Sequence, residues 1–228
     1  MLAGCPPARS DRDRGPVGRD DAPISHPLFA RAYARLSPGA ESRGLSEQRN
    51  KLLAGLSGRV LEVGAGNGLN FVHYPGTVIE VTAVEPEPHL RKLAVAAAAG
   101  APVPIRVVDA VAAELPFAAE AFDHVVFSLA LCSVADPRAA LSEAHRVLSP
   151  GGGLRYLEHV IAHRRAAAWL QRALDATVWP RLAGGCHLAR DTGALIRESG
   201  FAVQSERRIK PTWEQPPIPH LIGTASRI

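Results

Sequence analysis

Short runs of β-branched and aliphatic residues recur along the middle of the chain, and stretches with apolar residues at every third or fourth position separate them. Short apolar runs bounded by turn residues predict buried strands, whereas the wider spacing predicts amphipathic helices. Because strands and helices alternate, the sequence predicts a doubly wound, mostly parallel α/β sheet. The predicted strands are Gly58 to Val63, Glu80 to Val84, Ile105 to Val108, Ala121 to Ser128 and Gly153 to Val160, with helices from about Leu69, over His89 to Ala99 and over Pro137 to Leu148.

The pattern changes on both sides of this alternating region. Apolar residues at helical spacing predict two helices, Leu28 to Leu36 and Leu45 to Leu56, which we expect to form a cap over residues 25–57. Residues 161–190 predict a helical insert over the substrate pocket, with one long helix from Ala166 to Leu182.

The C-terminal part returns to strands. A helix over Asp191 to Ser199 begins with a capping aspartate and ends before Gly200. Two segments with alternating polarity, Phe201 to Ile209 and His220 to Arg227, then predict an antiparallel hairpin. With this hairpin the sheet is expected to have seven strands in all.

The first residues of the chain differ from all the others. Charged residues, prolines and glycines fill residues 1–24, so we expect a disordered tail without the apolar segment of a signal peptide. Residues 25–228 are enough for one domain with a full core. The apolar stretch from Val125 to Ala135 has 11 residues, whereas a membrane helix needs about 20. The sequence therefore predicts a single domain with no stable membrane anchor.

The overall charge is modest. Lys and Arg number 26 against 22 Asp and Glu, and no dense basic block with interleaved aromatic residues occurs, so nucleic acid is not expected as a partner. The cysteines, Cys5, Cys132 and Cys186, are too few and too scattered to predict a disulfide framework or a zinc site. We therefore expect a cytoplasmic protein that acts on a small molecule without a metal.

A glycine-rich turn follows the first predicted strand. Glycines at 64, 66 and 68 allow a sharp turn, and Glu62 lies just before them. A dinucleotide-binding turn would need a glycine where this chain has Leu69, and Glu62 would face the phosphates unfavourably. A cationic ligand without phosphate fits better, and S-adenosylmethionine has a sulfonium, an ammonium and a ribose.

Polar residues at the carboxyl ends of the other predicted strands extend this site, because open α/β sheets bind ligands there. We expect Glu85, next to Pro86, to bind the ribose hydroxyls, and Asp109, next to Ala110, to bind the adenine amine. Carbonyls near the end of the fourth strand would surround the methionine part, while Glu62 orders the loop or binds the ammonium. The expected cofactor residues are Glu62, Gly64, Ala65, Gly66, Gly68, Glu85, Pro86, Asp109, Ala110, Ser128 and Leu129.

Two histidines are candidates for the catalytic base. His159 ends the fifth predicted strand, and His187 follows a Gly-Gly-Cys sequence. The alternative for each is an ordinary hydrogen-bonded histidine, and for His187 this alternative is favoured. Cys132 lies in an apolar run and is expected to be a small packing residue, whereas Cys186 is left open between packing and reactivity.

The glycine-rich turn, with its acid, resembles the first motif of class I S-adenosylmethionine-dependent methyltransferases. A closer resemblance, from about Leu52 to the C-terminus, is to the methyltransferase-like family that includes the thiol S-methyltransferases of animal endoplasmic reticulum and lipid droplets. The motifs that carry it are Leu131-Cys132-Ser133-Val134, Arg146-Val147-Leu148-x-Pro150-Gly151-Gly152, Tyr156-x-Glu158-His159-Val160 and Gly185-Cys186-x-Leu188-x-Arg190.

This resemblance implies that Glu62, Glu85 and the glycines of the turn bind S-adenosylmethionine, and that the acceptor is a small alkyl or aryl thiol. The animal members begin with a hydrophobic anchor, whereas this chain begins with a charged tail. Methyl transfer to the oxygen or carbon of a phenol or quinone is the alternative reaction. A module that binds S-adenosylmethionine without turnover is the alternative from another class of protein.

Overall fold

A computed structural model describes residues 26–211 and 218–228. The predicted tail, residues 1–24, lies outside the described residues, as does most of the proline-rich linker between the last two strands. The described chain forms a seven-stranded sheet in the order β3-β2-β1-β4-β5-β7-β6. The first five strands are parallel, and β7 runs antiparallel to both β5 and β6. This is the predicted class I methyltransferase-like sheet with its C-terminal hairpin.

The strand bounds agree closely with the sequence pattern. The strands are β1 (Gly58–Val63), β2 (Val78–Val84), β3 (Ile105–Val108), β4 (Phe122–Ser128), β5 (Leu148–His159), β6 (Phe201–Ile209) and β7 (His220–Arg227). The largest difference is the start of β5, which was predicted at Gly153. The preceding turn is included in the strand because Leu148 pairs with Phe122 across an irregularity in the register.

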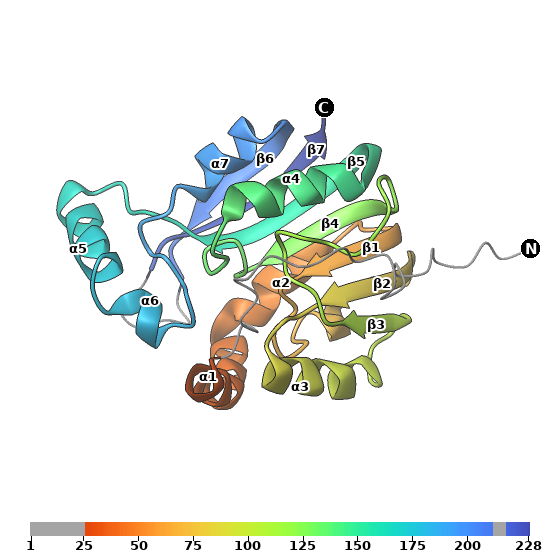
Figure 1. Cartoon of the computed structure of the whole chain (residues 1–228), viewed down its shortest axis with the longest axis horizontal. Helices are drawn as coiled ribbons and strands as arrows, with labels where there is room; N and C mark the ends of the chain where they lie inside the picture. Colours follow the sequence, from red (N-terminus) through yellow and green to blue (C-terminus); the bar gives the residue numbers. More distant parts are fainter. Residues whose placement is uncertain (1–25, 212–217) are drawn as a thin grey trace, which may run out of the picture.

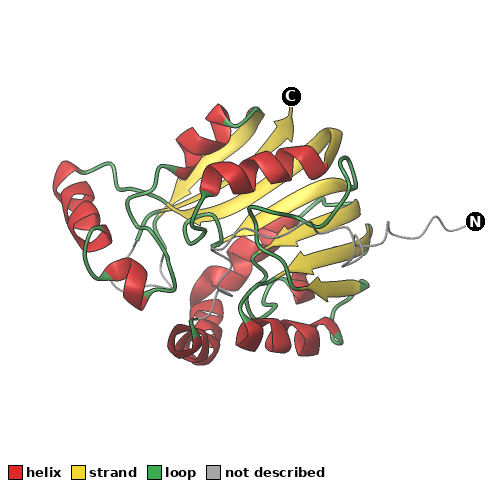
Figure 2. Ribbon diagram, viewed as in Figure 1, coloured by secondary structure: helices red, strands yellow, loops and turns green. Residues whose placement is uncertain are grey.

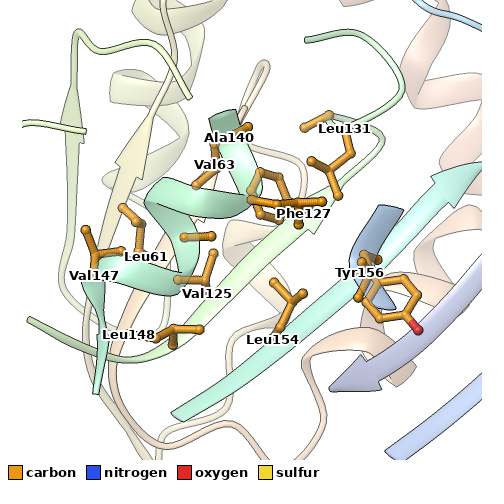
Figure 3. Packing of buried hydrophobic residues seen from close by; sticks show 14 of the residues in the cluster. Leu61, Val63, Val125, Phe127, Leu131, Ala140, Val147, Leu148, Leu154 and Tyr156 are labelled. Atoms are coloured by element: carbon orange, nitrogen blue, oxygen red, sulfur yellow. The ribbon is translucent and has the colours of Figure 1, made fainter. Parts of the chain in front are cut away.

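Alternating side chains divide the sheet into two buried faces. Leu61 and Val63 of β1 pack with helix α4 (Pro137–Val147) in one core cluster, and Val60, which precedes them, packs in the other. Figure 3 shows the first cluster, where α4 lies across β1, β4 and β5. The second cluster includes residues of α2 (Ser46–Leu53) and α3 (Pro88–Ala98). Because both faces are covered, consecutive residues of a central strand are buried together, as in Val125, Val126 and Phe127 of β4, each 0% exposed.

Figure 2 shows helices on both sides of the sheet and at the edge where the parallel strands end. The N-terminal cap consists of α1 (Pro27–Ala40), a π-helical turn (Glu41–Leu45) and α2. In Figure 1 the arrowheads of β1, β2 and β3 point toward α1. Helices α5 (Arg165–Asp175) and α6 (Trp179–Leu182) stand apart from the sheet, and α7 (Thr192–Glu198) packs against β6.

The prediction of one long helix from Ala166 to Leu182 was wrong. The chain forms α5 and α6 with a break after Asp175. Pro180 cannot donate a backbone hydrogen bond, so it starts a new helix instead of continuing the old one. Large apolar side chains of α5 are also exposed, since Trp169 is 70% and Leu170 53% exposed within the described chain.

The helix predicted from about Leu69 is only a short 3-10 turn, Phe71–His73. Pro75 follows and disfavours helical backbone at Tyr74. The hydroxyl of Tyr74 donates a hydrogen bond to Glu62 beneath the turn, which holds this segment in its non-helical path.

Within the described residues, no helix has both the length and the hydropathy needed to cross a bilayer.

Candidate active site

The glycine-rich turn leaves β1 at the edge where the parallel strands end. Gly64, Gly66 and Gly68 have φ angles of 75°, 57° and 81°, in the left-handed region that favours glycine. A Cβ atom on Gly64 would lie 2.6 Å from the Cβ of Ala130, and one on Gly68 would lie 2.8 Å from the Cβ of Ala97. Gly64 and Gly68 therefore make room for the protein's own chain, and the predicted contact of the three glycines with a cofactor stays a prediction. Ala65, between them, is buried.

Gly66 is the glycine whose surroundings leave space. A Cβ atom there would have the ring of Tyr33 as its nearest neighbour, at 3.6 Å. Tyr33 comes from α1, so the cap reaches over the turn. In the neighbouring residue, Asn67, Nδ2 donates to Ser37, whereas the buried Oδ1 has no hydrogen-bond partner in the described chain. This oxygen is an acceptor available to a donor group on a ligand.

Glu85 connects the end of β2 to the glycine-rich turn. Its carboxylate accepts hydrogen bonds from the backbone N–H of Gly66, at 2.7 Å, and of Glu87, at 2.9 Å. Burial raises the pKa of Glu85, and these two N–H groups partly oppose the rise. Pro86, also predicted to lie at the site, accepts a hydrogen bond from Arg91 through its carbonyl. The role of Glu85 toward a ribose stays a prediction.

Glu62 is almost completely buried, at 1% exposure. One carboxylate oxygen accepts from Asn70 Nδ2 at 2.8 Å and the other accepts from the Tyr74 hydroxyl at 2.7 Å. Burial raises its pKa to about 7, and these hydrogen bonds, together with Arg49, limit the rise. Glu62 therefore orders the segment after the glycine-rich turn. Its predicted contact with the cofactor's ammonium remains a prediction.

Arg49 is a buried residue at this site that the sequence analysis missed. It comes from α2 and donates to Glu41, to Asn70 at 2.7 Å and to Ser128 at 3.0 Å. Its position four residues after Leu45, on the apolar face of the helix, was the available signal. A cation at such a position has to meet partners inside the protein. Arg49 connects the cap, the glycine-rich turn and the end of β4.

The remaining predicted cofactor residues lie at the ends of β3 and β4. The Asp109 side chain is 67% exposed and forms an ion pair with Arg91 at 2.8 Å. Ala110 follows it and is partly buried. Ser128 ends β4, and Leu129 after it has a φ of 59°. For a leucine this left-handed conformation costs roughly 1–2 kcal/mol, and such strain is concentrated at functional sites.

A second group of side chains lies at the ends of β4 and β5. His159 Nδ1 is 3.5 Å from Cys132 Sγ and 3.4 Å from Cys186 Sγ. The sequence analysis treated these cysteines as scattered, but the fold brings them together. A hydrogen bond with Cys186, followed by burial, raises the pKa of Cys132. The same bond lowers the pKa of Cys186, and burial partly opposes this decrease.

His187, the other candidate base, contacts a different group. Its Nδ1 lies 3.1 Å from Asp175 Oδ2, and Oδ1 of the same carboxylate accepts from the backbone N–H of Leu188. A carboxylate in this position orients an imidazole and favours the tautomer with its proton on Nδ1. The assignment of residues 161–190 as a wall of the substrate pocket stays a prediction.

Comparison with known proteins agrees with this geometry. A family model described as "Methyltransferase domain" matches residues 61–156. Thiol S-methyltransferase TMT1B of Homo sapiens is 34% identical, over 89% of this chain and 87% of the relative, and that of Mus musculus is 37% identical, over 87% and 82%. The ubiquinone/menaquinone biosynthesis C-methyltransferase UbiE of Syntrophotalea carbinolica is 33% identical, over 70% and 71%.

Solved structures share the fold. An S-adenosylmethionine-dependent methyltransferase from Thermotoga maritima superposes with a TM-score of 0.64 at 22% identity, over 88% of this chain and 97% of that one. Geranyl diphosphate C-methyltransferase from Streptomyces coelicolor has a TM-score of 0.64 at 13% identity, over 80% and 78%. The sheet, the glycine-rich turn and these matches define a class I S-adenosylmethionine-dependent methyltransferase. More particularly, the chain belongs to the family that includes thiol S-methyltransferase TMT1B.

The residues at the turn fit S-adenosylmethionine, the methyl donor of this class. The carboxylate of Glu85 and the unpartnered oxygen of Asn67 would accept hydrogen bonds from the donor groups of the cofactor, and these contacts stay a prediction. Gly66 leaves the backbone of the turn open toward Tyr33. These acceptors match a cationic ligand and not a diphosphate.

Proposed function

We propose that the protein transfers the methyl group of S-adenosylmethionine to the sulfur of a small thiol. The observation that carries this proposal is the extent of similarity to the thiol S-methyltransferases. The family model ends at residue 156, whereas the match to TMT1B covers 87–89% of the chain. The similarity therefore includes residues after β5, where we expect the acceptor to bind.

Methyl transfer is an in-line displacement. The thiol sulfur has to lie about 3 Å from the methyl carbon, on the side opposite the sulfonium, and positioning supplies much of the rate. The new carbon–sulfur bond forms as the old one breaks, and the electron pair of the old bond goes to the departing sulfur. The chain's task is to hold both molecules in line and to exclude water.

The acceptor must also lose a proton. A thiol with a pKa of about 8.5 is only a few per cent thiolate at pH 7, so a base or a nearby positive charge would increase the reactive fraction. Of the two predicted bases, His187 has the partner that orients an imidazole, since Asp175 lies at its Nδ1. His159 instead contacts the two cysteines through its Nδ1.

The proposal is tested by incubating the purified protein with isotopically labelled S-adenosylmethionine and separate thiols, phenols and quinones. We expect labelled thioethers as the main products. Glu85→Ala should abolish labelling at limiting cofactor, and the exposed Glu114→Ala should not. Labelled ethers or C-methyl products with no thioether would exclude a thiol acceptor.

The similarity to UbiE favours a second reaction, C-methylation of a quinone precursor. The match is weaker in coverage, at 70% of the chain against 89% for TMT1B. The same incubations decide between the two, because a C-methylated ring and a thioether differ in mass fragmentation. Labelling of quinone precursors alone would replace the first proposal with this one.

A further inference from the structure

Three of the motifs behind the family resemblance meet at one place in the fold. Cys132 follows β4, His159 ends β5 and Cys186 precedes α7. The Sγ atoms of both cysteines and one ring nitrogen of His159 all lie within 4.8 Å of one another. β4 and β5 are neighbours in the sheet, so this group lies at the edge where the parallel strands end.

The backbone around Cys132 is fixed by a buried carboxylate. Glu158, which has no exposed surface, accepts hydrogen bonds from the backbone N–H groups of Ala130, Leu131 and Cys132, at 3.0, 2.9 and 3.0 Å. Glu158 immediately precedes His159 on β5. One acidic residue therefore fixes the distance between the first cysteine and the histidine.

The segment with Cys186 is joined to the same loop. The backbone N–H of His187 donates to the carbonyl of Cys132 at 2.7 Å. Arg190 donates to the carbonyls of Leu131 and Val134. A Cβ atom on Gly185 would lie 2.9 Å from the carbonyl oxygen of Ser133, so only glycine permits this close approach. The two cysteines, far apart in sequence, are thus held together by backbone contacts on both sides.

The distances suit a tetrahedral metal ion. Zn²⁺ binds thiolate sulfur at about 2.3 Å and imidazole nitrogen at about 2.0–2.1 Å, which places the two ligand atoms about 3.6 Å apart at a tetrahedral angle. The observed distances from His159 Nδ1 to the two sulfurs are 3.5 and 3.4 Å. Two thiolates and an imidazole are the donor set that zinc prefers.

Ordinary packing explains this arrangement less well. The cysteines are 1% and 5% exposed, as expected for small apolar residues. However, an imidazole nitrogen has one lone pair and accepts one S–H group well, whereas here two sulfurs lie at nearly the same distance from it. A cation between the three atoms satisfies all of them at once.

We propose that Cys132, His159 and Cys186 bind a Zn²⁺ ion, and that the acceptor thiol occupies its fourth position as a thiolate. The binding of the acceptor thiol to the zinc rests on the proposed function. Three protein ligands and one exchangeable position are the arrangement of a catalytic zinc. The thiol loses its proton to solvent on binding, and its sulfur then attacks the methyl carbon. The sulfonium leaves as a neutral thioether, and the methylated product, also a neutral thioether, is a weaker ligand and dissociates.

The test begins with metal content and does not depend on turnover. The full chain, purified with zinc and without chelators, should contain about one zinc per molecule by mass spectrometry. Cys132→Ser and Cys186→Ser should each reduce it at least tenfold, whereas Cys5→Ser should not. Calorimetry should show S-adenosylmethionine binding within about twofold of wild type in each variant, which establishes that the variants fold.

Cobalt replacement tests the geometry and the fourth position. The Co²⁺-loaded protein should show the visible bands of tetrahedral cobalt and a thiolate-to-cobalt charge-transfer band, which strengthens when a small alkyl thiol is added. His159→Gln should weaken the visible bands, and His187→Gln should not. A protein that binds neither Zn²⁺ nor Co²⁺ would overturn the site, as would a Cys132–Cys186 disulfide in protein kept under reductant.

Failure of the site and failure of the proposed function are distinguishable. Thioether formation by the wild-type protein is measured in parallel with metal content. Bound zinc without any thioether would contradict the thiol acceptor and leave the metal site intact. Thioether formation at an unchanged rate in the zinc-free Cys186→Ser variant would contradict the role of the metal.

Discussion

The unusual pKa of Glu62 predicts how stability depends on pH. The folded protein holds this carboxyl with a pKa of about 7, against an ordinary value of 4.5, because the group is buried. Between these two values the folded state keeps a proton that the unfolded state releases, so stability falls as pH rises through this window. Two-state linkage with these two values gives a loss of about 2.5 kcal/mol between pH 5 and pH 8.

The assay is urea unfolding at pH 5 and pH 8, at constant ionic strength, of the wild type and of Glu62→Gln. Glutamine keeps the shape of the side chain and does not titrate. Glu85 and Glu158, whose pKa values are also raised, are present in both proteins, so their effect cancels in the comparison. The wild type should lose about 2.5 kcal/mol more than the variant between the two pH values. Equal losses in both proteins would show that Glu62 ionises normally in the fold.

Three further substitutions test the site. Gly64→Ala should lower the free energy of unfolding in urea by about 2–5 kcal/mol, because the residue has a positive φ and its new Cβ would clash with Ala130. The control is Gly76→Ala, whose Cβ would meet nothing within 4 Å and which should change the free energy of unfolding by less than about 0.5 kcal/mol. Glu85→Ala should weaken S-adenosylmethionine binding by about 2–3 kcal/mol in calorimetry; unchanged affinity would contradict its role. Arg49→Met should lower the free energy of unfolding by about 3 kcal/mol, because Glu41 would lose the buried cation with which it forms an ion pair. An unchanged free energy of unfolding would contradict this role of Arg49.

The strands of the sheet were predictable from the sequence because each one coincides with a local run of β-branched and aliphatic residues or with alternating polarity. Gly58–Val63, Ile105–Val108, Phe201–Ile209 and His220–Arg227 begin and end where the pattern placed them. The predictions failed where distant residues decide local structure. The turn at Phe71–His73 is short because its neighbours bond to Glu62 and a proline follows.

The residues of the candidate site also fall into two groups: those that local sequence patterns predicted and those whose position depends on distant residues. The glycine-rich turn and Glu85 stand next to predicted strand ends, so strand order alone brings them together. Arg49 was missed because its partners come from three separate segments. The meeting of Cys132, His159 and Cys186 was missed because it depends on the path of the chain after β5, which no local pattern specifies.

The choice of acceptor atom is tested most directly by one substrate that carries both a thiol and a phenol, 4-mercaptophenol. The purified protein would be incubated with this compound and S-adenosylmethionine carrying a carbon-13 methyl group, and the product examined by NMR. A thiol methyltransferase gives the S-methyl product, whose methyl carbon resonates far upfield of an O-methyl carbon. Formation of the O-methyl or a ring-methylated product in its place would contradict thiol methylation.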